Sequence, residues 1–141
     1  MNMKQFLYKN LKELNFKIHE DKKVDSLDEG TIIFSSNRED TDLQFALIFS
    51  KLDDSIYLNV FATFPQPFLQ PSNELYQVLN KLNLNSDTGF LVFTQENEQY
   101  FISYRSTLLL GYDQLENDLL VQDFIFNSVN SFFVKKVELS L

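Results

Sequence analysis

The sequence predicts an α+β domain in which helices pack on an antiparallel sheet, with the element order α-β-β-β-α-β-β-α. Two observations lead to this prediction. Segments whose apolar residues recur every three or four positions lie at the beginning, near the middle and at the end of the chain, and segments with strict alternation fall between them. Because no linker, low-complexity tract or repeat interrupts the 141 residues, residues 1–141 are expected to form one domain.

The first half of the chain opens with a predicted amphipathic helix that begins at residue 3 and ends near residue 15, followed by strands. Residues 17–29 are charged and weakly patterned, so a loop or a short irregular strand is expected there. β-branched residues predict a strand over residues 31–35. Strict alternation predicts two more strands, over residues 43–49 and 56–64, which form a hairpin around the Asp53-Asp54-Ser55 turn.

The second half is expected to contain a helix, a hairpin and a last helix. Pro71 and Ser72 stop the preceding loop and provide a cap for a helix that ends in the Asn-rich stretch before Gly89. A hairpin of residues 90–94 and 98–108 follows, with its turn at Glu96 and Asn97. A third helix is expected from about residue 114 to residue 133 or beyond.

The third helix carries apolar residues on two sides. On a helical wheel, Leu120 and Phe124 lie away from the main apolar arc, which is formed by Leu115, Leu119, Ile125, Phe126, Val129, Phe132 and Phe133. A helix that is apolar on two sides must be covered on two sides. A dimer or client surface and burial under the loop at residues 65–71 both explain the second side, and both interpretations stay open.

Composition excludes several classes of protein. With 20 acidic and 12 basic residues the net charge is −8, so binding to nucleic acid or to an anionic membrane surface is not expected. The absence of Cys rules out disulfides, a thiolate nucleophile and a Cys-based zinc site. No segment approaches the roughly 20 apolar residues needed to span a bilayer, so a cytoplasmic protein is expected.

Catalytic and metal-binding signals are weak, and neither an enzyme nor a cofactor is expected. His19 beside Glu20 and Asp21 would suit a general base, but an exposed polar residue is the simpler interpretation. The acidic clusters at residues 25–29 and 39–42 lack the glycine and closing Glu of a calcium loop, and turn residues explain them. No metal site is predicted.

An aromatic surface is the better candidate for function. Tyr57, Phe61, Tyr100 and Tyr104 are too apolar for a fully hydrated sheet face, and the alternation must place some of them away from the main core. Arg105 follows in the same strand. Its guanidinium could bind a ligand carboxylate, although pairing with a structural Asp or Glu on a neighbouring strand is the more ordinary role.

Three short motifs stand out in the second half of the chain: the helix end VLNKLN at residues 78–83, the Gly-aromatic strand GFLVF at residues 89–93 and the strand segment ISYR at residues 102–105. With the element order, they resemble the YbjN domain family of small bacterial proteins. The resemblance implies the type III secretion chaperone-like fold, shared with small acidic chaperones that dimerise and hold an extended effector segment. Members of the family are described as sensory transduction regulators. The resemblance implies no catalytic residues. The charged residues 17–29 depart from the family's pattern.

These observations favour a non-enzymatic protein-interaction module, chaperone-like or regulatory. It is expected to be a homodimer that binds a client polypeptide through the aromatic sheet and helix surface formed by Tyr57, Phe61, Tyr100, Tyr104, Arg105, Leu120 and Phe124. The alternative is a small-ligand sensor with a pocket between sheet and helix, near Arg105.

Overall fold

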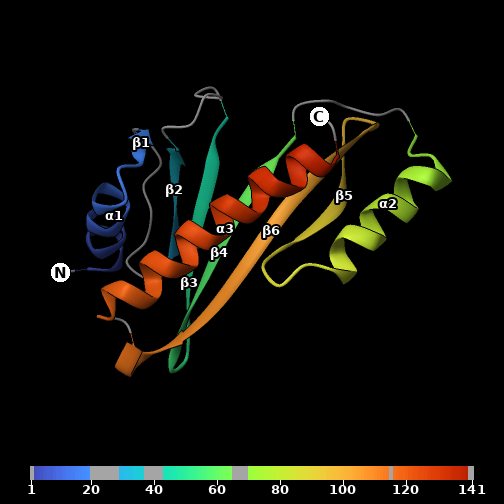
Figure 1. Ribbon diagram of the computed structural model, residues 1–141. Coiled ribbons are helices and arrows are strands. Elements are labelled where there is room, and N and C mark those ends of the chain that lie inside the picture. Colours follow the sequence, from blue (N-terminus) through green and yellow to red (C-terminus); the bar gives the residue numbers. More distant parts are fainter. Residues whose placement is uncertain (1, 20–28, 37–42, 65–69, 115, 140–141) are drawn as a thin grey trace.

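A single six-stranded antiparallel sheet organises the described part of the chain (Figure 1). The computed structural model describes residues 2–19, 29–36, 43–64, 70–114 and 116–139. The elements in chain order are α1 (Met3–Glu13), β1 (Lys17–His19), β2 (Glu29–Ser35), β3 (Phe45–Leu52), β4 (Ser55–Thr63), α2 (Asn73–Leu84), β5 (Phe90–Glu96), β6 (Gln99–Gly111), the 3-10 turn η1 (Tyr112–Gln114) and α3 (Asp118–Glu138). The predicted α+β class is confirmed.

The sheet differs from the expected strand arrangement at two places. The charged segment begins with a short strand, β1, which pairs Ile18 with Phe34 at the edge of the sheet, so the order is α-β-β-β-β-α-β-β-α. The two groups of strands form one sheet in the order β1-β2-β3-β4-β6-β5, because β4 pairs with β6 over nine residue pairs from Ser55–Gly111 to Thr63–Ser103. Long-range pairing of this kind leaves no local signal in the sequence.

The hairpin between β5 and β6 turns one residue later than predicted. Asn97 and Glu98 both adopt positive φ, at 51° and 65°, as the central residues of a type I′ turn do. Asn tolerates this conformation well and Glu does not, so only the Asn half of the turn has a sequence signal.

Polar side chains begin each of the three helices, as their sequences indicate. The side chain of Asn2 accepts a hydrogen bond from the backbone N–H of Gln5, and the side-chain oxygen of Gln5 accepts one from the backbone N–H of Asn2. Ser72 caps α2 through the N–H of Leu75. A side-chain oxygen at this position satisfies one backbone donor that the helix itself leaves unpaired.

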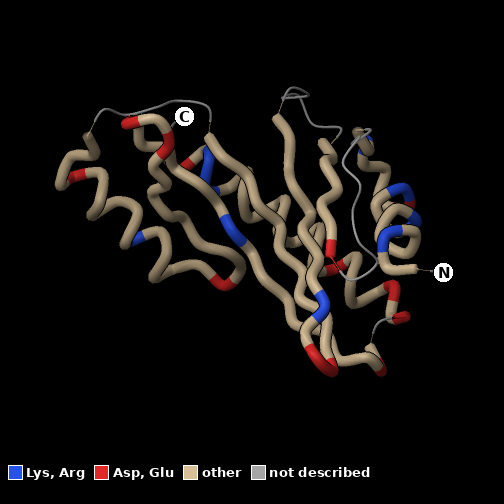
Figure 2. The backbone as a smooth tube through the Cα atoms, turned by 180° about the vertical axis from the view of Figure 1, so that it is seen from behind, with Lys and Arg blue, Asp and Glu red and all other residues tan. Residues whose placement is uncertain are grey.

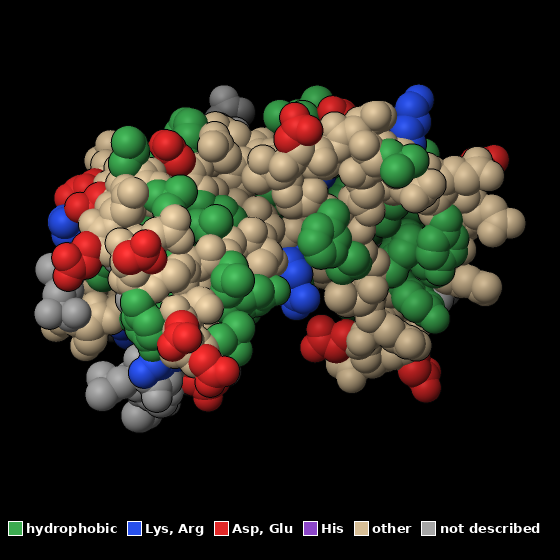
Figure 3. Space-filling model, turned by 90° about the horizontal axis from the view of Figure 1, so that it is seen from below, with side chains coloured by type: hydrophobic (Ala, Val, Ile, Leu, Met, Phe, Trp, Pro, Cys, Tyr) green, Lys and Arg blue, Asp and Glu red, His purple; other side chains and the backbone are tan. Residues whose placement is uncertain are grey.

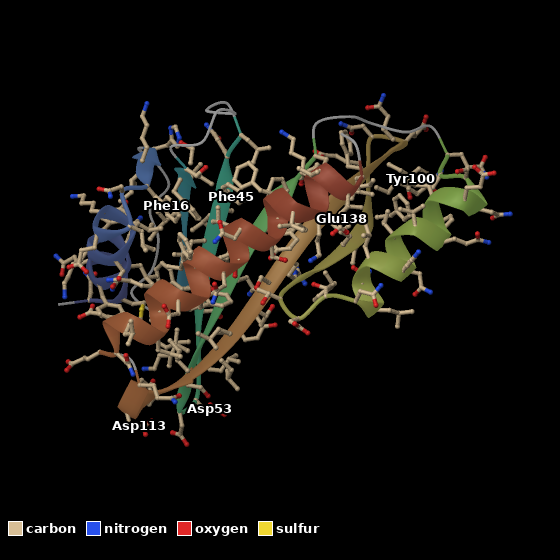
Figure 4. All side chains as sticks on the ribbon, viewed as in Figure 1. Phe16, Phe45, Asp53, Tyr100, Asp113 and Glu138 are labelled. Atoms are coloured by element: carbon tan, nitrogen blue, oxygen red, sulfur yellow. The ribbon has the colours of Figure 1, made fainter. Side chains whose placement is uncertain are left out.

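The hydrophobic core lies between α3 and one face of the sheet, here called the covered face, which carries Leu58, Val60 and Tyr104. Phe132 of α3 stands at its centre. Its ring centroid is 4.8 Å from that of Phe64 and 5.1 Å from that of Phe45. From Phe45 stacked rings continue through Phe34 to Phe16, with both residues at either end labelled in Figure 4. The high Phe content of the chain is used here.

The opposite face of the sheet, here called the open face, carries Tyr57, Phe61 and Arg105 on the two central strands. Figure 2 views the molecule from behind, with the strands in front of α3 and no described helix across them. Charged residues are sparse along the strands in this view and gather at turns and helices. One face of the sheet is therefore packed by a helix and the other is not, within the described residues.

Candidate interaction surface

The open face is built around one row of paired residues that starts at His19 on β1, which pairs with Ile33, and crosses the whole sheet. The strand registers align Ile33, Ala46, Phe61, Arg105 and Phe90, on β2, β3, β4, β6 and β5 respectively. Paired residues of antiparallel strands point to the same face, so the row is a continuous strip of side chains. Arg105 therefore lies between two Phe residues, and the row is apolar from Ile33 to Phe90 apart from Arg105.

Arg105 does not have the structural partner expected from the sequence. Its side chain is exposed, and its guanidinium forms no ion pair with a carboxylate in the described part of the chain. Its lateral neighbours are Phe61 and Phe90, and Phe90 is 42% exposed. A guanidinium with apolar rings on both sides keeps its five N–H donors available for an incoming acceptor.

Short polar side chains fill the open face beside this row. Ser103 is fully buried there, and its Oγ lies 3.2 Å from Oγ1 of Thr63 and 2.9 Å from Oγ1 of Thr94. One row further along, Thr107 donates a hydrogen bond of 2.7 Å to Asn59. These cross-strand hydrogen bonds satisfy polar groups without charge, so the face stays largely neutral.

The predicted aromatic set divides between the two faces. Tyr57 joins Phe61 and Arg105 on the open face, opposite the 56% exposed Leu109. Tyr104 does not belong to any exposed surface: it is fully buried on the covered face, and its hydroxyl donates a 2.8 Å hydrogen bond to the carbonyl of Ser128 on α3. Tyr104 and Arg105 are neighbours in β6, so their side chains point to opposite faces of the sheet.

Tyr100 lies apart from the other candidates. It is half-buried at the end of β6 next to the hairpin turn, where Figure 4 labels it on the side of α2, and it pairs with Gln95. The registers place Tyr100 on the same face as Tyr104, because the two are four residues apart in one strand. It does not extend the strip around Arg105.

The second apolar side of α3 involves other residues than predicted. Leu120 and Phe124 are half-buried and pack against the core, whereas Leu119 and Phe126, assigned to the inner arc, are 69% and 48% exposed. The buried residues of α3 are Val121, Ile125, Ser128, Val129, Phe132 and Lys135. Because the helix is apolar nearly all round, its periodicity did not reveal which side faces the sheet. Leu115 lies outside the described residues.

An outer stripe of α3 therefore remains exposed. It consists of Leu119, Phe126, Val134 and Val137, with the last two 56% and 77% exposed. At 100° per residue these four side chains lie within roughly 80° of one another along the length of the helix. Figure 3 shows the molecule from below, where hydrophobic side chains reach the surface on both sides of a hollow in its outline.

The remaining sequence candidates show no catalytic arrangement among the described residues. The ring Nε2 of His19 lies 3.0 Å from Oγ of Ser35, and the side chain is half-buried at the sheet edge rather than exposed. Glu20, Asp21 and most of the two acidic clusters lie outside the described residues. Within the described ranges no group of three His, Asp or Glu residues could hold a metal, and no helix is long and apolar enough to cross a membrane.

Asn83, from the Asn-rich stretch expected to end the helix, has a structural role as well. Its amide donates to the carbonyl of Leu91 at 2.9 Å and accepts from the N–H of Leu91 at 2.7 Å. The side chain therefore pairs with β5 as another strand would. Together with the contact between Tyr76 and Phe93, whose ring centroids are 4.7 Å apart, it attaches α2 to this edge of the sheet.

The alternative of a sensor pocket near Arg105 requires correction. A pocket between the sheet and α3 would open on the covered face, whereas the Arg105 side chain belongs to the open face. Its guanidinium cannot line such a pocket. A ligand pocket between the sheet and α3 must use other residues.

Comparison with known proteins adds a likeness in fold. No family model matches the sequence, and no curated protein matches it. Among solved structures, the chain is similar to the crystal structure of YbjN, a proposed transcription regulator from E. coli, with a TM-score of 0.46 and 14% identity over 89% of this chain and 92% of that chain. The solved structure carries the name of the family that the three sequence motifs resemble. The likeness concerns the fold alone, and no function follows from it.

Proposed function

We propose that this protein is a non-enzymatic protein-interaction module that binds an extended polypeptide segment on the open face of its sheet. The observation that carries the proposal is the exposed guanidinium of Arg105 between Phe61 and Phe90, with no carboxylate partner in the described part of the chain. Leu109 and Tyr57 form a second apolar pair on the same face, beyond the hydrogen-bonded pair of Asn59 and Thr107.

The chemistry of this surface defines the segment that would fit. A carboxylate that reaches Arg105 can form a bidentate pair with the guanidinium, and flanking apolar side chains can cover the two Phe rings. We therefore expect a segment with one Asp or Glu between apolar residues. The negative net charge of −8 disfavours strongly acidic partners, so a single carboxylate suits the site better than an acidic tract.

The test is a selection followed by measurement. Random peptides displayed on phage would be selected against the wild-type protein, and affinities of the enriched peptides measured by fluorescence polarisation. We expect a shared carboxylate flanked by apolar residues and a loss of about tenfold or more in affinity for Arg105→Gln. Lys81→Gln is the matched control, because Lys81 is an exposed cation on α2. Equal binding by the Arg105 variant would refute the proposed site.

The homodimer is a second part of the proposal, and the outer stripe of α3 is the surface proposed for it. In the monomer, four apolar side chains on one side of a 21-residue helix are in contact with water, which is unfavourable. An equivalent helix of a second copy would cover them. Light scattering on the wild-type protein should give twice the chain mass, and Phe126→Asp should give the chain mass. Leu109→Asp, which changes an equally exposed residue on the open face, should remain dimeric. A wild-type monomer at all concentrations would exclude this part.

A further inference from the structure

A cavity of about 250 Å³ lies between the end of α2, the loop that follows it and the last turns of α3. The residues that line it are Leu82, Asn85, Ser86, Asp87, Thr88, Ser131, Val134, Lys135 and Glu138. It is separate from the open face, because α3 packs on the covered face. Glu138, labelled in Figure 4, stands on the last turn of α3 near this region.

A buried cation forms the inner wall of the cavity. The Lys135 side chain is only 6% exposed, and its Nζ donates to Oγ of Ser86 at 2.6 Å and Oγ of Ser131 at 2.8 Å. The third contact, to the carbonyl of Thr88, is longer at 3.3 Å. All three acceptors are uncharged. A buried ammonium without a hydrogen-bonded carboxylate is costly, since uncharged acceptors compensate only part of its lost hydration.

The electrostatic setting of Lys135 is consistent with an incompletely compensated charge. Burial lowers the pKa of Lys135, and the negative charge of Glu138 partly opposes this by raising it. The ring of Tyr104 lies beneath Nζ, with its centroid at 5.8 Å, and supplies no carboxylate. An anionic group that entered the cavity could take over the hydrogen of the long Thr88 contact while the two serine contacts persist.

The rim of the cavity has the opposite charge. Asp87 and Glu138 are both exposed and both line the opening, with the amide of Asn85 beside them. Leu82 and Val134 provide apolar wall. The cavity thus combines one inner cation with two outer carboxylates and an apolar side. A simple anion would meet repulsion at the rim, and a simple cation would meet repulsion from Lys135.

We propose that this cavity binds a small zwitterion of the α-amino acid class, with the ligand carboxylate on Lys135 and the ligand ammonium at Asp87 and Glu138. The apolar wall formed by Leu82 and Val134 accommodates a short apolar side chain. A cavity of about 250 Å³ is large enough for such a molecule. The site gives the protein a small-ligand function that is independent of polypeptide binding on the open face.

The test is calorimetric titration of the full chain with each of the 20 standard L-amino acids, with thermal shift as a second readout. We expect saturable binding of one or a few small apolar amino acids, and a melting temperature that rises with their concentration. Two compounds are matched controls for the best ligand: the amine that lacks its carboxylate and the carboxylic acid that lacks its amine. Each carries half of the charge pattern and should bind at least about tenfold more weakly.

Variants distinguish the site from adventitious binding. Asp87→Asn changes an exposed rim residue and should fold normally while weakening the best ligand several-fold. Lys135→Met should abolish binding, and Asp123→Asn, an exposed carboxylate at the other end of α3, should leave it unchanged. Binding by none of the amino acids, or binding unaffected by Asp87→Asn, would overturn the proposal. Neither outcome bears on Arg105, because the peptide assay uses a different face.

Discussion

The covered face and the open face of the same sheet differ in how their side chains are packed. On the covered face, Phe132 interlocks with Phe45, Phe64 and Tyr104, and the hydroxyl of that tyrosine is hydrogen-bonded to α3. On the open face, short hydroxyl side chains bond across strands and Arg105 stands exposed between two Phe residues. The first arrangement excludes water and stabilises the fold. The second retains exposed apolar area and an unused charge, which suits recognition.

Removing a large ring should separate the two faces most clearly. Phe132→Ala deletes a fully buried side chain and should lower the free energy of unfolding by about 3–5 kcal/mol. Phe61→Ala removes the same ring from a half-buried position on the open face and should cost roughly 1 kcal/mol, because less area leaves the protein interior. Urea denaturation followed by circular dichroism measures both. Similar losses would show that the open face is packed as tightly as the covered one.

The attachment of α2 to the sheet gives the next largest effect. Asn83→Ala leaves the backbone N–H and C=O of Leu91 without their partner and should cost about 1–2 kcal/mol in the same assay. Asn80→Ala, at an exposed position of the same helix, should change stability by less than about 0.5 kcal/mol. If the two variants behaved alike, the strand-like pairing of Asn83 would have no energetic role.

Removing one hydroxyl from each face compares how much the two faces contribute to stability. Tyr104→Phe removes the hydrogen bond to Ser128 and should destabilise the protein by about 1 kcal/mol. Tyr57→Phe removes a hydroxyl from the open face and should have an effect below about 0.5 kcal/mol. Thermal unfolding of both variants decides this. A larger loss for the Tyr57 variant would reverse the ranking of the faces.

The smallest expected effect is a pH dependence due to Lys135. Burial lowers its pKa in the folded state below the ordinary 10.5, so between the two values the unfolded chain binds more protons than the folded chain. Stability contributed by this group must then rise with pH in that window. Tyr104, whose pKa is raised by burial, is present in both proteins. The stability difference between wild type and Lys135→Met should therefore increasingly favour the wild type as pH approaches 10.5. A constant difference would contradict the lowered pKa.

The helices and hairpins were predictable because their signals are local. The cap at Ser72, the apolar spacing of the first helix and the alternation in β3 and β4 each involve residues within one turn or one strand. The hairpin turn was misplaced by one residue because Glu98 is an unusual choice for positive φ. The short strand β1 was not assigned because three residues carry too little pattern.

The candidate site was only half predictable from the same signals. Tyr57, Phe61 and Arg105 were selected for their chemistry, and the registers bring them to one face. Tyr104 was selected for the same reason and lies in the core. The alternation of apolar and polar residues predicts that neighbours in a strand point to opposite faces. It does not predict which face a helix will cover.

The sequence alone therefore determined the α+β class, the order of most elements, the acidic charge and the lack of Cys chemistry, since these depend on composition and on contacts between near neighbours. Tertiary structure decided that β4 pairs with β6, that α3 turns Val121 and Phe132 inward and Leu119 outward, and that Lys135 meets Ser86. The physical reason is that these contacts join segments far apart in the chain. Their free energy comes from the burial of one specific face, which no local pattern encodes.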